Sequence, residues 1–317
     1  MLLVSTISEN IEKITKSMLK RNIDIRPVLE KIIKTDTKRR SIQSSLDNSL
    51  SDSNQLAKEI GDLYKKGGSQ KASVLKEKAG VLKAESKKLS EILTNTIYEL
   101  NNLLLEVPNI PHKLVPSGSN ESDNEEILQL GSMPKLKQNA LAHWELANKY
   151  DIIDFKLGNK ITGAGFPVYK GKGAKLQRAL INYFLDKNTK AGYKEVQVPI
   201  LVNENSGTGT GQLPDKEGQM YYIKEDNLYL APTAEVPVTN IFRNTIVKFS
   251  DLPICLTSYT PCFRREAGSY GSHVRGLNRL HQFDKVEIVR IEDPENSYNA
   301  LQEMVDHVKS ILNDLNL

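Results

Sequence analysis

Hydrophobic residues repeat with helical spacing through much of the first third of the chain. From Leu75 onward the steps alternate between four and three residues, and most of the positions hold leucine. They are residues 75, 79, 82, 86, 89, 93, 96, 100 and 103. Such a repeat is typical of a coiled-coil seam. Upstream, a weaker repeat, interrupted at Ser53, is carried by Leu46, Leu50, Ala57, Ile60 and Tyr64.

Two glycines separate the two halves of this repeat, within KKGGSQ at residues 65–70. Glycine ends helices readily and allows the chain to reverse. We therefore predict one long antiparallel hairpin of two helices over residues 27–105. At a rise of about 1.5 Å per residue, helices of about 38 residues would be roughly 55 Å long. Ile7, Ile11 and Ile14 have helical spacing and predict a small helix packed beside the hairpin.

Positive charge is concentrated at the tip of this predicted hairpin. Residues 58–90 hold nine lysines and four acids, a net charge of +5, whereas the whole chain carries +4. Two interpretations stay open: an ordinary solvated helix face, or a surface that follows nucleic-acid phosphates through salt-sensitive contacts. Aromatic residues are scarce there, so the second interpretation implies recognition of backbone and shape. The candidate contacts are Lys58, Lys65, Lys66, Lys71, Lys76 and Lys78.

Prolines, glycines and an acidic run at residues 107–126 end the helical region. Beyond them the pattern predicts an α+β domain, with an antiparallel β-sheet flanked by helices. The expected helices cover residues 137–149, 173–191 and 297–317, and the expected strands cover residues 194–201, 219–223, 227–231, 253–263 and 283–291. The predicted domain plan is a helical arm at 1–108, a linker at 109–130 and a catalytic domain at 131–317.

Composition narrows the class of protein. No apolar run approaches the roughly 18 residues of a membrane span, and the N-terminus does not read as a signal peptide, so we expect a cytoplasmic protein without a membrane partner. The two cysteines, Cys255 and Cys262, lie beside a predicted strand. We expect reduced, partly buried thiols rather than a disulfide or a metal site.

Arginines and histidines gather between the last two predicted strands, in FRREAGSYGSHVRGLNRLHQFDKVE at residues 263–287. Alternation along a strand would place Arg264, Glu266, Arg279, Phe283 and Glu287 on one side of a hairpin, together with His281 and Lys285. Guanidinium groups match phosphate and carboxylate oxygens, and an aromatic ring can stack on a base. The pattern therefore predicts a nucleotide site, with or without an amino acid. The alternative is a set of surface ion pairs around a core phenylalanine.

The loop between these strands carries further candidates for anion binding: Arg265, His273 and Arg275, with Gly268, Gly271 and Gly276. The usual phosphate-binding loops, GxxxxGK[ST] and a GxGxxG that follows a strand, do not occur. The glycine-rich GTGTGQLPDKEG at residues 207–218 is interpreted as a flexible flap that opens no helix. For His281, and for His112 in the linker, we expect structural roles.

These segments together resemble the seryl-tRNA synthetases, a family of class II aminoacyl-tRNA synthetases. FRREAGSYG and RGLNRLHQFDKVE are similar to the family's motif 2, and LYLAPTAEVPVTN at residues 228–240 is similar to its serine-binding TAE segment. Residues 173–203 resemble motif 1, residues 107–118 resemble the interdomain linker, and the basic hairpin resembles the tRNA-binding arm. The resemblance extends over essentially the whole chain, in order.

The resemblance implies a serine-tRNA ligase that uses ATP and Mg²⁺ to activate L-serine as seryl-adenylate. The seryl group would pass to tRNA(Ser), and selenocysteine tRNA would be a further acceptor. The family's motif 1 also implies a homodimer. Thr233 and Ala234 would bind serine together with Glu235, Arg264 and Glu287. The implied ATP-binding residues are Arg264, Arg265, Glu266, Arg279, Leu280 and Phe283, and the implied catalytic residues are Arg264, Glu266, Arg279 and Glu287.

One departure from the family concerns the C-terminal part. The family continues with a magnesium-binding carboxylate, a serine-selecting hydroxyl residue and the glycine-rich motif 3, whereas this chain has thirty residues after Glu287 and its last glycine is Gly276. We therefore expect a truncated or partial sequence with a half-built ATP site and no metal ligand of its own. Two alternatives stay open: a catalytically inactive, synthetase-like tRNA-binding protein, and a ligase that charges a carrier protein, against which the basic arm argues.

Overall fold

The computed structural model describes residues 2–266 and 275–317. They divide into two compact units, Met1–Met133 and Pro134–Leu317. The loop residues Gly268, Gly271 and His273 lie outside the described residues. Within those residues, no helix is long and apolar enough to cross a membrane.

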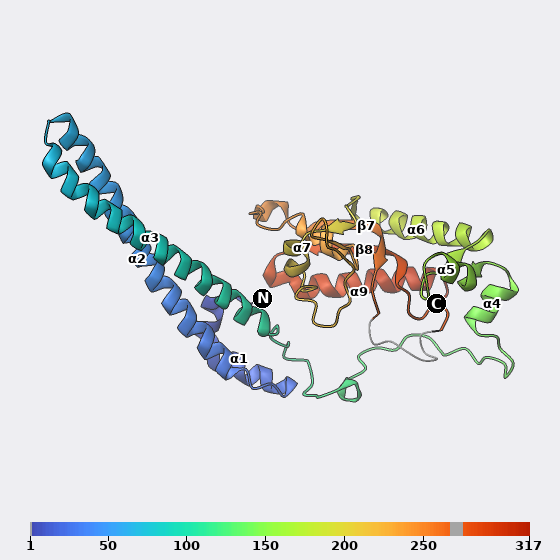
Figure 1. The fold of residues 1–317 in the computed structure, drawn as a ribbon. Coiled ribbons are helices and arrows are strands. Elements are labelled where there is room, and N and C mark those ends of the chain that lie inside the picture. The colour runs from blue at the N-terminus through green and yellow to red at the C-terminus, as the bar shows by residue number, and fades with distance from the viewer. Residues whose placement is uncertain (1, 267–274) are drawn as a thin grey trace. The chain divides into compact units, whose positions relative to one another are not determined.

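The first unit is built on an antiparallel pair of long helices (Figure 1). Helix α2 (Arg26–Lys65) has a proline in its first turn, where the missing N–H leaves no hydrogen bond unmade. Gly67, with φ of +79°, lies in the short turn before α3 (Ser69–Glu106). The predicted hairpin is confirmed. Helix α1 (Val4–Met18) precedes it and is followed by a short 3₁₀ helix, η1 (Leu19–Arg21).

The seam of the hairpin follows the prediction fully on α3 and only in part on α2. All nine predicted positions of α3 are buried or half-buried. On α2, Leu46 and Ile60 lie in the seam as predicted. The prediction is wrong by one residue at Leu50, Ala57 and Tyr64, which are exposed, and the residues before them, Ser49, Leu56 and Leu63, take their places. The Ser49 and Ser86 hydroxyl oxygens lie 2.9 Å apart inside the seam, so the pairing satisfies two buried polar groups.

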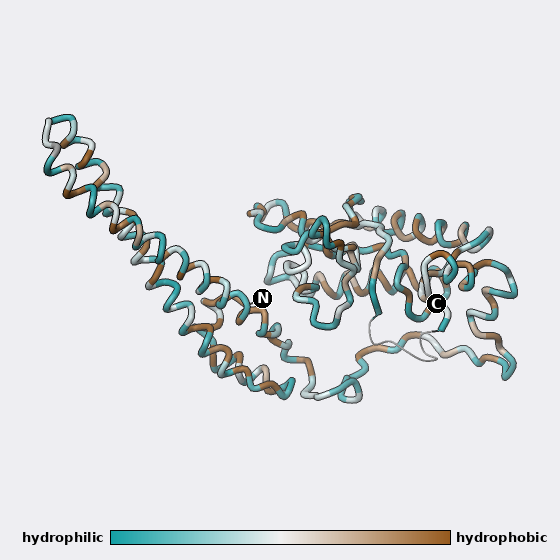
Figure 2. Tube along the Cα trace, viewed as in Figure 1, coloured by the Kyte–Doolittle hydropathy of each residue, from teal (hydrophilic) through white to brown (hydrophobic). Residues whose placement is uncertain are grey.

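The base of the hairpin has its own hydrophobic core. Ile7, Ile14 and Met18 of α1 are fully buried against Leu29 and Ile32 of α2 and the last turns of α3. Figure 2 shows that hydrophobic residues are frequent there and that the tip is mostly hydrophilic. Hydrophobic packing thus stabilises the hairpin at its base, while the tip carries the positive charge.

The second unit is α+β, as predicted. Its helices are α4 (His143–Lys149), α5 (Phe155–Ile161), α6 (Lys172–Lys190), α7 (Glu204–Gly209), α8 (Glu235–Asn240) and α9 (Ser297–Asp314). Its strands are β1 (Ile153–Asp154), β2 (Val168–Tyr169), β3 (Lys194–Glu195), β4 (Leu201–Val202), β5 (Tyr222–Ile223), β6 (Leu228–Leu230), β7 (Ile254–Phe263) and β8 (Gln282–Ile291). They form the sheets β1-β2, β3-β7-β8 and β4-β6-β5.

Several predicted boundaries are corrected. The strand expected at 194–201 is two short strands in different sheets, because Pro199 lies between them and cannot donate to a ladder. The first of them, β3, runs parallel to β7, so this sheet is mixed. The helix expected from residue 137 begins only at His143, where the Glu145 carboxylate accepts a hydrogen bond from the Ala142 N–H, 2.8 Å away. The predicted strand at 219–223 is reduced to Tyr222–Ile223.

The longest strands of the unit, β7 and β8, form an antiparallel pair, which confirms the predicted hairpin. Its register pairs Ser258 with Glu287 and Cys262 with Phe283. Residues paired in this way share one face of the sheet. On that face Leu256 packs against Ala234 and Val238, at the start of α8 and within it. The hairpin therefore places the residues of β8 beside the segment that leads into α8.

Candidate functional site

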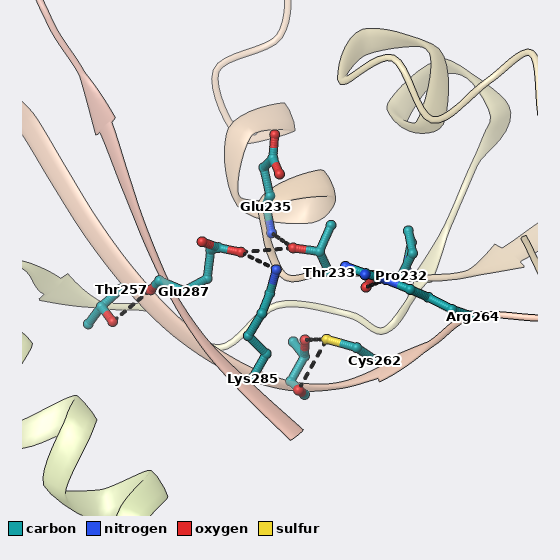
Figure 3. Close-up of polar contacts among 9 residues, drawn as sticks. Pro232, Thr233, Glu235, Thr257, Cys262, Arg264, Lys285 and Glu287 are labelled. Atoms are coloured by element: carbon teal, nitrogen blue, oxygen red, sulfur yellow. Dashed lines mark hydrogen bonds and ion pairs between the residues drawn. The ribbon is translucent and has the colours of Figure 1, made fainter. Parts of the chain in front are cut away.

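A carboxylate with two donors on a single oxygen forms the centre of the site (Figure 3). Oε2 of Glu287 accepts a hydrogen bond from the Thr233 hydroxyl at 2.8 Å. The same Oε2 lies 2.8 Å from Nζ of Lys285. Thr233 is 3% exposed. Residues 285 and 287 are two apart on β8 and so share a face, and the turn before α8 brings Thr233 to them.

The structure places the remaining residues of the TAE segment differently. Ala234 is fully buried and packs in the core. Glu235 is exposed, and in Figure 3 its carboxylate points away from Glu287. The Glu235 N–H donates to the Thr233 hydroxyl at 3.2 Å, so this hydroxyl caps the helix start and also contacts Glu287. Thr233 and Glu287 are thus brought together, and the Glu235 side chain is not.

Arg264 follows β7 and is held at two points. Its Nε donates to the carbonyl oxygen of Pro232 at 3.3 Å. Its guanidinium carbon lies 5.1 Å from the centre of the Phe283 ring, within the range of a cation–π contact. The backbone N–H of Arg264 extends the ladder by donating to the His281 carbonyl at 2.9 Å. The arginine and the aromatic ring that the sequence suggested for a nucleotide therefore lie together.

Glu266 and Arg279 face each other beyond the ends of the two strands. Nη1 of Arg279 lies 3.1 Å from Oε2 of Glu266. The Glu266 side chain is 12% exposed and that of Arg279 is 55% exposed. Glu266 has φ of +48°, an uncommon conformation for a residue with a Cβ, which turns the chain where the strand ends. Leu280, the next residue after Arg279, is buried.

A cluster of rings also lies at the end of the hairpin. His281 stacks on Phe166, and its Nδ1 lies 2.6 Å from the Tyr221 hydroxyl. The guanidinium of Arg265 lies 5.6 Å from the centre of the Tyr221 ring, and its backbone N–H donates to the Gln219 carbonyl. A Cβ at Gly165 would come within 2.3 Å of the His281 ring. The contacts of His281 are thus packing and hydrogen bonding, in line with the structural role predicted for it.

The described end of the motif 2 loop rests on α4. The Arg275 guanidinium lies 4.9 Å from a ring centre of Trp144, and the Leu277 N–H donates to Nε2 of His143 at 2.8 Å. Gly276 has φ of +75°, and a Cβ there would lie 2.2 Å from the His143 ring nitrogen. A cavity of about 860 Å³ lies alongside, bordered by Arg275, Arg279, Trp144 and Phe166.

Buried polar residues connect β7 to the helices behind it. The Thr257 hydroxyl donates to the Glu287 carbonyl at 2.9 Å and accepts from the Asn188 amide at 2.9 Å. The side-chain oxygen of Asn188, Oδ1, lies 2.7 Å from Nε2 of His307 on α9. Burial is the main cause that lowers the pKa of His307, and the charge of Lys187 lowers it further. These contacts join α6, α9 and both strands.

Two other groups of this sheet have features that the sequence does not predict. The Ser258 hydroxyl is buried and is the single buried side-chain nitrogen or oxygen without a hydrogen-bond partner in the described part of the chain. Burial, together with a hydrogen bond to Asp284, raises the pKa of Tyr259 to about 12. Cys255 and Cys262 are free thiols, one half-buried and one buried, as predicted.

The glycine-rich segment after β4 contains the end of a helix. Its first residues complete α7, which begins at Glu204, and the segment opens no helix of its own, as expected. The side-chain amide of Asn203 caps this helix by accepting from the Ser206 N–H at 2.9 Å. Backbone bonds from Gln212 and Leu213 to the Gly207 carbonyl fix the following turn.

The six lysines proposed as nucleic-acid contacts are all exposed on the hairpin of the first unit.

Sequence reasoning missed three supporting residues of the site. They are Lys285, which contacts Glu287, Pro232, whose carbonyl accepts from Arg264, and Tyr221, which lies beside Arg265. Strand alternation placed Lys285 on the correct face but could not indicate which group it contacts. No group of three or more histidine, cysteine, aspartate or glutamate side chains within residues 2–266 and 275–317 could hold a metal.

Comparisons with known proteins agree with this geometry. Residues 1–111 match the model of the seryl-tRNA synthetase N-terminal domain, and residues 221–317 match the tRNA synthetase class II core domain (G, H, P, S and T). A protein of Salinibacter ruber named serine–tRNA ligase is 44% identical over 317 residues, which are 100% of this chain and 74% of that protein.

Two solved structures are similar over 99% of this chain. The seryl-tRNA synthetase of Pyrococcus horikoshii, complexed with ATP, is 28% identical with a TM-score of 0.75, and 75% of its chain is covered. The cytoplasmic serine-tRNA ligase of Naegleria fowleri, in complex with AMP, has a TM-score of 0.78 over 76% of its chain. At 23% identity the second supports the fold alone. With its whole length matched at 44% identity, the chain belongs to the seryl-tRNA synthetase family.

Proposed function

We propose that this chain is a serine-tRNA ligase, which activates L-serine with ATP and transfers it to tRNA(Ser). Selenocysteine tRNA is proposed as a further acceptor. The observation that carries the proposal is the contact between the Thr233 hydroxyl and the Glu287 carboxylate at 2.8 Å. It brings the TAE segment and the motif 2 strand together at one polar site. A carboxylate and a hydroxyl side by side can bind both the ammonium and the hydroxyl group of serine.

Rejection of alanine follows from the same groups. Glu287 is largely buried, with a side chain 22% exposed, so a bound amino acid without a hydroxyl would leave one of its oxygens unpaired. Sites that hydrogen-bond a substrate hydroxyl reject the analogue without it strongly for this reason. The Glu235 carboxylate points away, so Glu235 would contact serine through its backbone or after a change of rotamer.

ATP would occupy the end of the β7–β8 hairpin. Phe283 would stack on adenine, Glu266 would accept from the adenine amino group, and Arg279 would hold the γ-phosphate. Arg264 would hold the α-phosphate and the serine carboxylate, with Arg265 and the backbone of Leu280 nearby. Because Arg279 and Glu266 are paired at 3.1 Å, nucleotide binding would exchange this ion pair for contacts with ATP.

The reaction needs no covalent intermediate with the protein. A serine carboxylate oxygen attacks the α-phosphorus of ATP, and the bond from this phosphorus to the bridging oxygen breaks, which releases pyrophosphate. A terminal ribose hydroxyl of the tRNA then attacks the seryl carbonyl, and AMP leaves. Arg264 and Arg279 would stabilise the charge that develops on the phosphate oxygens.

Other parts of the proposal rest on family membership. They comprise the tRNA-binding arm at 1–108 with its exposed lysines, the linker at 109–130, the catalytic domain at 131–317, the homodimer and the cytoplasmic location. The family also implies Mg²⁺. The described residues offer no cluster of carboxylates that fits this ion, so no step is assigned to it.

The test is serine-dependent exchange of labelled pyrophosphate into ATP. The 317-residue chain would be compared with a chimaera that adds the part of the Salinibacter ruber protein outside the matched region. Exchange with serine, and not with alanine or threonine, in either protein supports the proposal. Absence of exchange in both proteins, with tRNA binding retained, would favour a non-catalytic tRNA-binding protein instead.

A further inference from the structure

Lys285 is the cation that contacts the Glu287 carboxylate. Its Nζ lies 2.8 Å from Oε2, on the oxygen that also accepts from Thr233. The nearby arginine, Arg264, is engaged elsewhere, because it donates to the Pro232 carbonyl and lies over Phe283. Figure 3 shows the Lys285 ammonium beside Glu287, while the Arg264 side chain extends to Pro232 and Thr233.

Both contacts fall on one oxygen of the carboxylate, and this limits its orientation. Two donors on Oε2 restrict the rotation of the carboxylate plane and so fix the direction of Oε1. Within the described residues, no side chain donates to Oε1 in a hydrogen bond or ion pair. The oxygen that remains is therefore the one offered to a ligand donor.

The side chains involved are held with little freedom. Thr233 is 3% exposed and its hydroxyl also accepts from the Glu235 N–H. The Glu287 backbone is fixed by the β7–β8 ladder and by the Thr257 hydroxyl on its carbonyl. The Lys285 side chain is 32% exposed, so its charge is only partly screened by solvent. An ion pair in such surroundings restrains geometry better than one on an open surface.

We propose that Lys285 is a positioning residue for amino-acid recognition: it holds Oε2 of Glu287 so that Oε1 accepts from the ammonium or hydroxyl group of serine. Lys285 acts through Glu287 and does not itself contact the amino acid. The inference rests on the proposed function, because it takes Glu287 as part of the serine site.

The test measures binding of a stable seryl-adenylate analogue, the seryl sulfamate of adenosine, to the full 317-residue chain by calorimetry. Lys285→Met should weaken binding about tenfold or more, since a charged hydrogen bond that orients the acceptor is lost. Lys285→Arg keeps a cation at this position and should stay within about threefold of the unchanged chain. The matched control is Lys224→Met, at an exposed lysine of the same unit.

A double-mutant cycle distinguishes positioning from direct contact. If Lys285 acts through Glu287, Lys285→Met should add little to the loss caused by Glu287→Gln. Wild-type affinity in Lys285→Met would overturn the inference, as would losses that sum in the double variant. If the folded wild-type chain does not bind the analogue, the proposed function itself fails. Binding that is unaffected by Lys285→Met overturns the positioning role alone.

Discussion

Arg279 and Glu266 form an ion pair in the structure, with Nη1 and Oε2 3.1 Å apart. Each is proposed to bind a different end of ATP, so they contact each other where the nucleotide would separate them. The pair neutralises two charges in the free protein. It also shows that the backbone beyond β7 and β8 already brings the two proposed ATP ligands to one place.

Removal of the Arg279 guanidinium should weaken the binding of ATP more than the binding of AMP. In Arg279→Met the affinity for ATP is expected to fall about tenfold to hundredfold, because one charged contact with the γ-phosphate is lost. AMP lacks this phosphate and should bind within about threefold of wild type. Equilibrium dialysis with both nucleotides measures the difference, and Glu266→Gln is the matched comparison, since loss of the adenine contact should weaken both ligands alike. Equal losses of ATP and AMP in Arg279→Met would contradict the assigned role.

Substitutions at the neighbouring residues Ser258 and Thr257 are expected to change the free energy of unfolding in opposite directions. The Ser258 hydroxyl is buried without a partner, so Ser258→Ala should raise the free energy of unfolding by about 1 kcal/mol. The Thr257 hydroxyl bonds to Asn188 and to the Glu287 carbonyl. Thr257→Val removes this hydroxyl at nearly constant shape and leaves the Asn188 amide and the Glu287 carbonyl without this partner. It should therefore lower the free energy of unfolding by about 1–3 kcal/mol. Urea unfolding of both variants tests this, and a destabilised Ser258→Ala would indicate that the hydroxyl is bonded in solution.

His307 should make the stability of the second unit depend on pH. Burial and the charge of Lys187 lower its pKa below the ordinary value of 6.5, so the unfolded chain binds the proton more tightly than the folded one. The stabilising contribution is complete above pH 6.5 and is lost as the pH falls through the folded pKa. Between pH 7 and pH 5 the wild type should therefore lose more stability than His307→Gln, as measured by chemical unfolding at each pH. Parallel curves for the two proteins would contradict the burial argument.

The tip lysines should control tRNA affinity through charge alone. Replacement of Lys65, Lys66 and Lys71 by glutamine is expected to weaken tRNA binding and to reduce the slope of log K against log salt by about two to three. The same change at Lys13, Lys16 and Lys34, exposed lysines away from the tip, is the control. Filter binding between low and moderate salt gives the slopes. Equal slopes in the two triple variants would favour the simple solvated surface.

The sequence was sufficient for features set by local periodicity. The hairpin, the β7–β8 pair and the shared face of Phe283, Lys285 and Glu287 follow from spacing, and the structure has them. It was insufficient where partners decide the outcome. Ser49 occupies the seam in preference to Leu50 because a hydroxyl on the facing helix pairs with it.

Contacts within the site show the same limit. Nothing local to LYLAPTAEVPVTN indicates that the Thr233 hydroxyl reaches residue 287, fifty-four positions away, while the Glu235 carboxylate points elsewhere. Two further contacts are likewise consequences of tertiary packing. They are the hydrogen bond from Arg264 to the Pro232 carbonyl and the contact of Arg265 with the Tyr221 ring. Residue types can suggest a nucleotide and an amino acid, but the pairing of donors and acceptors depends on the fold.

The serine pair in the seam has a consequence for the mechanics of the arm. If α2 slipped along α3 by one heptad, Ser49 would lose the Ser86 hydroxyl and face an apolar side chain, while Ser86 would keep its hydrogen bond to the Leu82 carbonyl. Slippage is therefore penalised at one defined point, as a single buried polar residue fixes register in other coiled coils. The turn at Gly67 then stays at a constant distance from the α1 core. The arm that is proposed to bind tRNA would therefore present its tip at a fixed length.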